Sequence, residues 1–527
     1  MKQQVVNAFE EAIKKLGVET QVELTPSKGH GDFATNIAMK ISRQLNDSPV
    51  NVANKIIANL NGEFIEKAEV AGPGFINIFL KSNVLASQVE AIISQGENFG
   101  KANQGKFINV EYVSANPTGH LHLGHARGAA IGSTLVDILR FAGNKVDAEY
   151  YINDAGNQID ILGISSWTRY KNLFGFNIEL PENSYRGVDI NECAEHLRDN
   201  VFGDKYKDSN YEDVANEFKA ESKKYLLEII RQHLAQYGVV FELYSSEQSI
   251  YDNNQIKPAL EKLKEFSYEL DGATWLKTTL KGDDKDRVMV KSDNTLTYFT
   301  PDIAYHNIKL SRGYDELINI WGADHVGYIK RMAVALEFLG LPQDKLDIFT
   351  VQLVKLMKDG EELKMSKRKG TSYTLQELIE EVGKDAARWF MLDRSNNSEF
   401  VFDINVATSK TSDNPVFTVQ YTHARANQLI NKSEKQAKAE EYENNEVELI
   451  NLLNKFPELI LTMANTHKVH LLPQYLLEVT RDFNSWYSNS KLIGHPREES
   501  LLALVKATKV VLSNGLKLLG ISAPDKM

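Results

Sequence analysis

The chain has 527 residues, 42% hydrophobic and 25% charged, which is ordinary globular composition at a length that favours several domains. The formal charge of −11 gives no global signature of nucleic-acid binding, so any RNA contact must use local basic surface. The single cysteine, Cys193, excludes an internal disulfide and any CxxC motif, which indicates the cytoplasm. The first 17 residues predict an amphipathic helix and lack the apolar run of a signal peptide or membrane span.

Residues 1–104 are expected to form a small α+β domain. Helical stretches alternate there with short strand-like runs, of which FINIFL at 75–80 is the clearest. The preceding AGPGF supplies a turn. A polar stretch then separates this domain from the segment that follows.

The segment 105–400 carries the pattern of a doubly wound parallel sheet. A strand-like run at 107–114 leads through a glycine-containing turn into a helix, and a second strand-like run follows at 145–154. Strand, helix and strand in that order form a right-handed parallel unit, with a ligand crevice at the strand ends. Active-site residues are therefore expected near 111–125.

The rest of the chain predicts an insertion, a second half of the sheet and a helical end. Residues 160–285 are polar and helix-like, which indicates an insertion. Strand-like signals resume at 286–300, 316–325 and 347–360, and we expect them to complete the same sheet. Residues 401–527 carry apolar residues at i, i+3, i+4 and i+7, which predicts a C-terminal all-α bundle.

The motif HLGH at 122–125 predicts an anion site at the start of a helix. Backbone N–H groups and the helix dipole would face the crevice there. Gly124 leaves room for a flat base, and His122 and His125 can both donate to phosphate oxygens. Two alternatives stay open: with His120 the histidines could form a fortuitous metal cluster, or they could be polar residues at an exposed helix start.

A second motif, KMSKR at 364–368, offers a basic loop that can close on a phosphate tail opposite the histidines. A solvated basic loop is the alternative. Such a loop would have no reason to follow the second half of a split nucleotide fold in this order. The two motifs together therefore predict a nucleotide site.

The pair resembles the HIGH and KMSKS signatures of class I aminoacyl-tRNA synthetases, which implies a Rossmann-like catalytic domain. In such enzymes an ionised amino-acid carboxylate attacks the α-phosphate of ATP, so alignment and electrostatics suffice. The resemblance assigns catalysis to His122, Gly124, His125, Lys364, Met365, Ser366 and Lys367. It assigns ATP binding to Pro117, Thr118, Gly119, His122, Gly124, His125, Lys364 and Lys367.

Longer segments narrow the family. VEYVSANPTGHLHLGHARGAA, DRVMVKSDNTLTYFTPDIAYH, WGADHVGYIKR, NPVFTVQYTHAR and GLKLLGISAPDKM are similar to segments of bacterial-type arginyl-tRNA synthetases, and GDFATNIAMKI extends the likeness into that family's N-terminal domain. The resemblance implies activation of L-arginine with ATP to arginyl-adenylate and pyrophosphate, then transfer of arginine to the 3′-terminal adenosine of tRNA(Arg).

Arginine presents a planar cation with five donors, so its pocket needs carboxylates. Glu111 and Asp302 are the obvious candidates, although a strand-end salt bridge and an N-terminal helix charge are the alternative for them. The resemblance implies that Glu111, Tyr298 and Asp302 face the side chain. It implies that Ser114 and Asn116 hold the α-amino and α-carboxylate groups, with Asp324 and His325 as weaker candidates.

The resemblance makes 401–527 the anticodon-binding domain and 1–104 the module that contacts the outer corner of tRNA. Tyr421, His423 and Arg425 lie on one predicted helix and combine stacking with phosphate contacts. A packed helix with one charged face is the alternative. The resemblance also implies that tRNA must bind before arginine is activated.

Three other functions are alternatives. A small-molecule adenylyltransferase has no need of a C-terminal helical bundle. An inactive RNA-binding protein has no reason to keep both motifs, and a class I synthetase for another amino acid would not need two carboxylates to bind a cation. ATP is expected as a substrate with Mg²⁺ on its triphosphate, and no zinc is expected. We expect a monomer with no membrane association.

Overall fold

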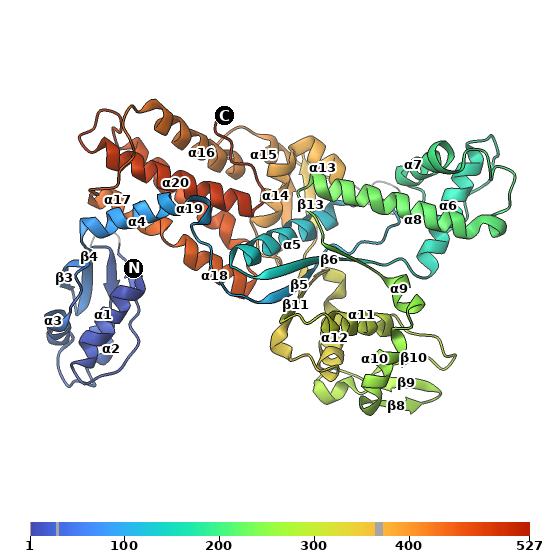
Figure 1. Ribbon diagram of the computed structural model, residues 1–527, viewed down its shortest axis with the longest axis horizontal. Helices are drawn as coiled ribbons and strands as arrows, with labels where there is room; N and C mark the ends of the chain where they lie inside the picture. Colours follow the sequence, from blue (N-terminus) through green and yellow to red (C-terminus); the bar gives the residue numbers. More distant parts are fainter. Residues whose placement is uncertain (1, 28–30, 364–372) are drawn as a thin grey trace.

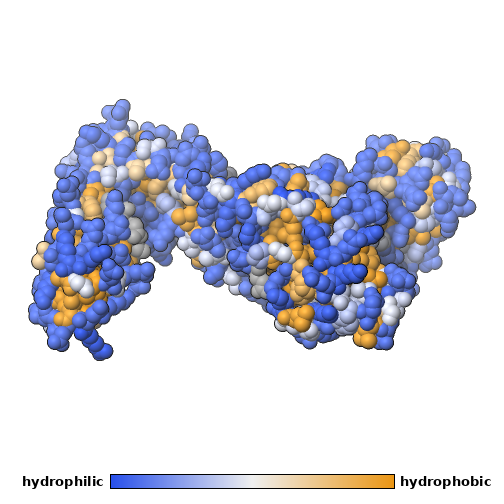
Figure 2. Space-filling model, turned by 60° about the horizontal axis from the view of Figure 1, so that its bottom comes forward, coloured by the Kyte–Doolittle hydropathy of each residue, from blue (hydrophilic) through white to orange (hydrophobic). Residues whose placement is uncertain are grey.

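The computed structural model describes residues 2–27, 31–363 and 373–527. The molecule is elongated, with the N-terminal domain and the C-terminal helices at one end and a helical insertion at the other (Figure 1). Figure 2 shows the same extended outline with a mostly hydrophilic surface. Among the described helices, none is both long and apolar enough to cross a membrane.

The N-terminal domain is a small α+β unit, as predicted. Its antiparallel sheet has the order β1-β2-β4-β3 and its apolar face packs on three helices. The FINIFL segment forms β4, in which exposed and buried residues alternate as a half-buried strand requires. The elements are α1 (Lys2–Lys14), β1 (Thr25–Pro26), β2 (Phe33–Thr35), α2 (Ile37–Ile41), α3 (Pro49–Asn59), β3 (Ile65–Ala71) and β4 (Phe75–Leu80).

The catalytic centre of the fold is a five-stranded parallel sheet of order β12-β11-β5-β6-β7. The chain adds β6 and β7 on one side of β5 and later adds β11 and β12 on the other side. The prediction of a doubly wound sheet is confirmed. The switch point lies between β5 and β11, where such sheets bind their ligands. The strands are β5 (Phe107–Glu111), β6 (Lys145–Ile152), β7 (Leu243–Ser246), β11 (Glu316–Gly322) and β12 (Leu346–Val351).

The two faces of this sheet differ in chemistry. Alternate residues such as Ile108 and Val110 enter a large apolar core beneath α5 (Leu123–Phe141). Their neighbours Asn109 and Glu111 point to the opposite face, under α11 (Phe299–Ser311). That second face therefore holds buried polar groups, and it lies at the crevice.

The helical insertion is smaller than the sequence pattern indicates. It comprises α6 (Asn157–Asn172), α7 (Val188–His196), a π-helical turn at Leu197–Phe202 and α8 (Tyr211–Gln236), at the right of Figure 1. The chain then returns to the central sheet as β7, inside the segment 160–285. β7 has only four residues, too few for alternation to reveal it.

One strand predicted for the central sheet lies in another sheet, and a second joins the central sheet only with its first half. The 286–300 segment forms β10, which pairs antiparallel with β9 in a separate sheet, and the 347–360 segment continues past β12 into β13 of a third sheet. Alternation reveals a strand but not its partner. The elements here are α9 (Glu247–Asp252), α10 (Ile256–Leu263), β8 (Ser267–Leu270), β9 (Ala273–Leu276), β10 (Arg287–Val290), α12 (Val326–Phe338), β13 (Val354–Lys358), β14 (Glu361–Glu362) and β15 (Phe400–Asp403).

The C-terminal segment is a helical bundle, as predicted. Its core is continuous with the core around α5, so the bundle and the catalytic domain share one apolar interior. In Figure 1, α4 runs from the N-terminal domain along this bundle. The helices of the C-terminal segment are α15 (Ile404–Thr408), α16 (Pro415–Lys432), α17 (Asn444–Leu453), α18 (Phe456–Thr466), α19 (Leu471–Ser488) and α20 (Glu498–Leu518). Three helices from earlier in the chain pack against them or lead into them: α4 (Ser82–Gln95), α13 (Leu375–Val382) and α14 (Lys384–Leu392).

Candidate active site

The turn after β5 carries strained backbone at the switch point. Val113 and Ser114 both have positive φ, +68° and +39°, a conformation that L-residues adopt rarely and that clusters at functional sites. The Tyr151 backbone N–H donates to the Ser114 hydroxyl at 3.1 Å and holds this turn against β6. The residues following β5 are thereby presented to the crevice.

The HLGH motif begins α5, as the sequence predicts. The His122 Nδ1 accepts the Gly124 N–H at 3.1 Å, and the His125 Nδ1 accepts the His122 N–H at 3.2 Å. With Nδ1 as the acceptor, the proton of each neutral ring is on Nε2. Both rings are therefore oriented as donors at a helix N-terminus, an arrangement suited to phosphate oxygens.

The segment after KMSKR lies beside this turn. The Leu123 N–H donates to the Tyr373 carbonyl at 3.0 Å, and the Leu375 N–H donates to the Leu121 carbonyl at 2.8 Å. The predicted catalytic residues Lys364, Met365, Ser366 and Lys367 lie outside the described residues. Among the described residues, Tyr373 and Leu375 contact the turn that carries the first motif.

His120 faces the insertion. Its ring lies 3.1 Å from the Glu192 carboxylate, and its backbone N–H donates to Asp189 at 3.1 Å. The same Asp189 carboxylate leaves no room for a Cβ at Gly119. In the described part of the chain, no group of three or more His, Cys, Asp or Glu side chains could hold a metal ion, so the metal-cluster alternative for the histidines gains no support.

Asp302, on the first turn of α11, is a carboxyl group set in the crevice. It accepts a hydrogen bond from the Tyr328 hydroxyl at 2.8 Å. Burial raises its pKa to about 7, with Glu247 and Glu111 adding to the shift and Tyr328 opposing it. An acidic group whose ionised form is short of counter-charge is suited to a cationic ligand.

Glu247 is a second such carboxyl group, which the sequence reasoning missed. It is buried at the start of α9, and burial followed by the charge of Asp154 raises its pKa to about 7. Asp302, Glu247 and Glu111 in turn raise the pKa of Tyr151, after burial, so these groups surround one space. Glu247 stands in a polar segment, where nothing in the sequence pattern distinguishes it.

The other residues predicted for arginine lie at the rim. Tyr298 caps α11 and is 87% exposed. Asn116 donates to the Gln158 amide. Asp324 and His325 follow β11 at the carboxyl edge of the sheet, where their exposed side chains pair at 3.5 Å.

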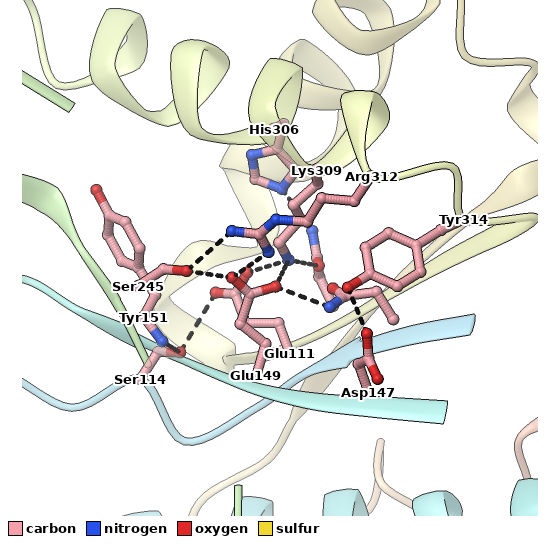
Figure 3. A network of polar contacts seen from close by, with 12 residues as sticks. Glu111, Ser114, Asp147, Glu149, Tyr151, Ser245, His306, Lys309, Arg312 and Tyr314 are labelled. Carbon is pink, nitrogen blue, oxygen red and sulfur yellow. Dashed lines mark hydrogen bonds and ion pairs between the residues drawn. The ribbon is translucent and has the colours of Figure 1, made fainter. Parts of the chain in front are cut away.

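Glu111 belongs to a buried ionic network under α11 (Figure 3). The ammonium group of Lys309, which is fully buried, lies 2.5 Å from the Glu111 Oε2. The Ser114 hydroxyl donates to the Glu111 Oε1 at 3.3 Å. One oxygen of Glu111 therefore forms a salt bridge, which was the alternative interpretation of this residue. The other oxygen points toward the turn after β5. In the sequence, this network is indicated by polar residues at alternating positions of strands that are otherwise apolar, as in β5.

The three residues predicted for tRNA contact all lie on α16 but differ in their exposure to solvent. Tyr421 is 41% exposed, and the Arg425 guanidinium lies 4.8 Å from its ring centre while donating to Asn484. His423 is buried, and its Nδ1 lies 2.9 Å from the Pro524 carbonyl. Burial lowers its pKa, which keeps the ring neutral. His423 is thus placed inside the bundle, whereas Tyr421 reaches the surface.

The doubly wound parallel sheet and the HLGH helix at its switch point, together with a KMSKR motif in the sequence, define a class I aminoacyl-tRNA synthetase. Family models agree along the chain: residues 1–80 match the arginyl tRNA synthetase N-terminal domain, 88–432 match the catalytic domain of tRNA synthetases class I (R), and 419–527 match the DALR anticodon-binding domain. The chain belongs to the arginine–tRNA ligase family.

Curated relatives share this assignment. The chain is 45% identical to the arginine–tRNA ligase of Mycoplasma mobile and 43% identical to that of Bacillus pumilus, in both cases over 100% of this chain and 99% of the relative. The Thermus thermophilus arginyl-tRNA synthetase has the same fold, with a TM-score of 0.78 at 22% identity and full coverage of both chains. The activity is the ATP-dependent ligation of arginine to tRNA, and the rival functions are not favoured.

Proposed function

We propose that the HLGH turn holds ATP and that its histidines bind the triphosphate. The observation that carries this proposal is the paired capping of His122 and His125, in which each Nδ1 accepts a backbone N–H and the ring proton is therefore on Nε2, at a helix N-terminus. The backbone at Gly124 and the turn 117–119 would contact the adenine and the ribose. Lys364 and Lys367, with Met365 and Ser366 between them, would stabilise the charge that develops on the leaving pyrophosphate.

Arginine would lie at the switch point with its guanidinium between Asp302 and Glu247. Both carboxyl groups lack a cationic partner strong enough to keep their pKa low. Glu111, Ser114 and Asn116 would hold the α-amino and α-carboxylate groups, since they follow β5 at the edge of the crevice. Tyr298 would cover the pocket, with Asp324 and His325 at its other rim.

The reaction would then need only alignment. The arginine carboxylate attacks the α-phosphorus, the bond to the β-phosphate breaks, and pyrophosphate leaves with its electron pair, which gives arginyl-adenylate. A hydroxyl group of the 3′-terminal adenosine next attacks the arginyl carbonyl and releases AMP. His122 and His125 act as electrostatic donors and need not gain or lose a proton.

Magnesium would enter bound to ATP, as part of the substrate. Across the described ranges no cluster of protein ligands for a metal is present, and the triphosphate oxygens would supply ligands to the ion. On the RNA side, Tyr421 and Arg425 would contact tRNA(Arg), with His423 supporting them from inside.

We further propose that the chain works as a monomer in the cytoplasm without membrane association, in keeping with its buried, unpaired Cys193.

Substitution of the two pocket carboxyl groups tests this placement. Asp302→Asn and Glu247→Gln should each raise the KM for arginine by about 30-fold or more, because loss of a charged partner in a desolvated site costs roughly 2–5 kcal/mol. The KM for ATP should change little. Glu361→Gln, an exposed carboxylate on β14, is the matched control. Wild-type arginine dependence in both variants would refute the pocket.

A further inference from the structure

Two glutamates lie side by side in the central sheet. The parallel register pairs Glu111 of β5 with Glu149 of β6, and both side chains are buried. Like charges directly opposite each other in a sheet repel, and away from water one of them would take up a proton unless a cation intervened. This arrangement therefore requires a counter-charge from another element.

Lys309 of α11 supplies that charge (Figure 3). Its Nζ lies 2.5 Å from the Glu111 Oε2 and 4.0 Å from the Glu149 Oε2, and it donates to the Asn319 Oδ1 at 3.2 Å. The side chain is fully buried. Its ammonium group is thus fixed between β5, β6 and β11 and is shielded from the crevice by its own helix.

Glu149 has a second cation, which Glu111 does not share. Arg312 donates to the Glu149 Oε1 at 2.8 Å, and Asn109 donates to its Oε2 at 2.7 Å. Burial opposes ionisation of Glu149, but Lys309, Ser245 and Arg312 outweigh it and lower the pKa to about 2. With Arg312 balancing Glu149, the charge of Lys309 is available to balance Glu111.

Glu111 is consequently turned in a defined direction. Its Oε2 points down to Lys309, and its Oε1 points toward the Ser114 hydroxyl, 3.3 Å away, at the strained turn above. Asp302, in contrast, is held by the neutral Tyr328 hydroxyl. The charge of Glu111 is therefore balanced by Lys309 within the protein. Asp302 has only a neutral partner and is suited to a cationic ligand.

We propose that Lys309 is a positioning residue for the amino-acid site: its ammonium group pairs with Glu111 and holds it turned toward Ser114, and so leaves Asp302 and Glu247 to balance the guanidinium. This inference rests on the proposed placement of Glu111 beside bound arginine. Lys309 acts through Glu111 and touches no substrate. The titratable groups facing Glu111 are Lys309, Asp302, Tyr305, His306 and Arg312 from α11 and its end, Glu149 and Tyr151 from β6, and Glu247 from α9.

Lys309→Met tests the proposal by removing the charge while keeping an unbranched side chain. Aminoacylation would be measured with arginine or ATP as the varied substrate. We expect the KM for arginine to rise about tenfold or more, because Glu111 then loses the ion pair that fixes its direction. The KM for ATP should stay within about threefold. Lys345→Met, at an exposed position, is the control.

The double variant Lys309→Met/Glu111→Gln distinguishes positioning from bulk stability. It removes the ion pair as a unit, so it should fold even if Lys309→Met does not, and its KM for arginine should equal that of Glu111→Gln alone. A KM for ATP that rises as much as the KM for arginine in Lys309→Met would overturn the proposal, as would a double variant weaker than Glu111→Gln. Wild-type arginine dependence in Glu111→Gln itself would instead refute the proposed placement of Glu111.

Discussion

At the scale of single residues, the proposed placement of arginine between Asp302 and Glu247 predicts a pH-dependent affinity. Each carboxyl group has a pKa raised to about 7, chiefly by burial, whereas the guanidinium stays protonated throughout. The ionised carboxylates bind arginine, so below pH 7 binding must release protons, and the arginine affinity should fall as the pH drops from 8 to 6. Calorimetry at pH 6.5 in two buffers of different ionisation heat would measure that release.

The same titration in variants identifies the groups responsible. Asp302→Asn/Glu247→Gln should abolish most of the proton release, although its weaker binding calls for higher arginine concentrations. Glu361→Gln should release as many protons as the wild type. Identical heats in the two buffers for the wild type would contradict the assignment.

His122 has two roles that one pair of substitutions separates. Its Nδ1 caps α5 through the Gly124 N–H, and its Nε2–H is assigned to phosphate. His122→Asn keeps a capping acceptor and loses the distal donor, whereas His122→Ala loses both. Both variants should form arginyl-adenylate about 10²–10³-fold more slowly, measured in the presence of tRNA.

Only the alanine variant should be less stable, by about 1 kcal/mol in denaturant unfolding, because it alone removes the cap. A wild-type rate in His122→Asn would show that the distal nitrogen does not serve the reaction.

At the scale of elements, Arg388 joins α14 to three other parts of the chain. The buried guanidinium donates to the Leu519 carbonyl at 2.6 Å, the Tyr237 carbonyl at 3.1 Å and the hydroxyls of Ser133 and Thr134 on α5. Arg388→Met should lower the free energy of unfolding by roughly 2–5 kcal/mol, since it leaves these buried acceptors without a donor.

Urea unfolding measures this loss. Arg394→Met is the control, because Arg394 is exposed and meets Asp393 only at 3.7 Å. A change below about 0.5 kcal/mol in Arg388→Met would mean that water replaces the lost donor.

The elements also mark what the sequence could predict. β5, α5 and β6 were predicted because local order and periodicity determine a strand-helix-strand unit. The partner of β10 was not, since an isolated strand carries no information on which edge it joins. At the site, Glu111 and Asp302 were found through motifs, whereas Glu247 and Lys309 come from segments with no motif and become visible only when α9 and α11 fold over β5.

At the scale of the whole molecule, His467 links the bundle to the catalytic sheet. This residue ends α18 with a left-handed φ of +57°. Its ring lies 2.5 Å from the Asp347 carboxylate and 3.4 Å from that of Glu316, at the starts of β12 and β11. β11 ends next to Asp324, so a shift of the bundle could reach the active site along a rigid strand.

The arginyl-tRNA synthetase resemblance implies that arginine is activated only with tRNA bound, and this contact offers a route. Pyrophosphate exchange with arginine and ATP should be near background alone and should rise sharply with tRNA(Arg). Because the bundle and α5 share one core, truncation would expose apolar surface, and a point substitution is the better probe. His467→Asn tolerates the left-handed backbone but is too short to span both carboxylates, so it should bind tRNA normally and lose most of the stimulation.

His495→Asn is the matched control, since the His495 ring bonds to the Arg497 N–H within the bundle. It should keep full stimulation. Robust exchange by the wild type without tRNA would refute the coupling. Full stimulation of His467→Asn would refute only the route, because a signal that passes through the His467 ring cannot survive the loss of that ring.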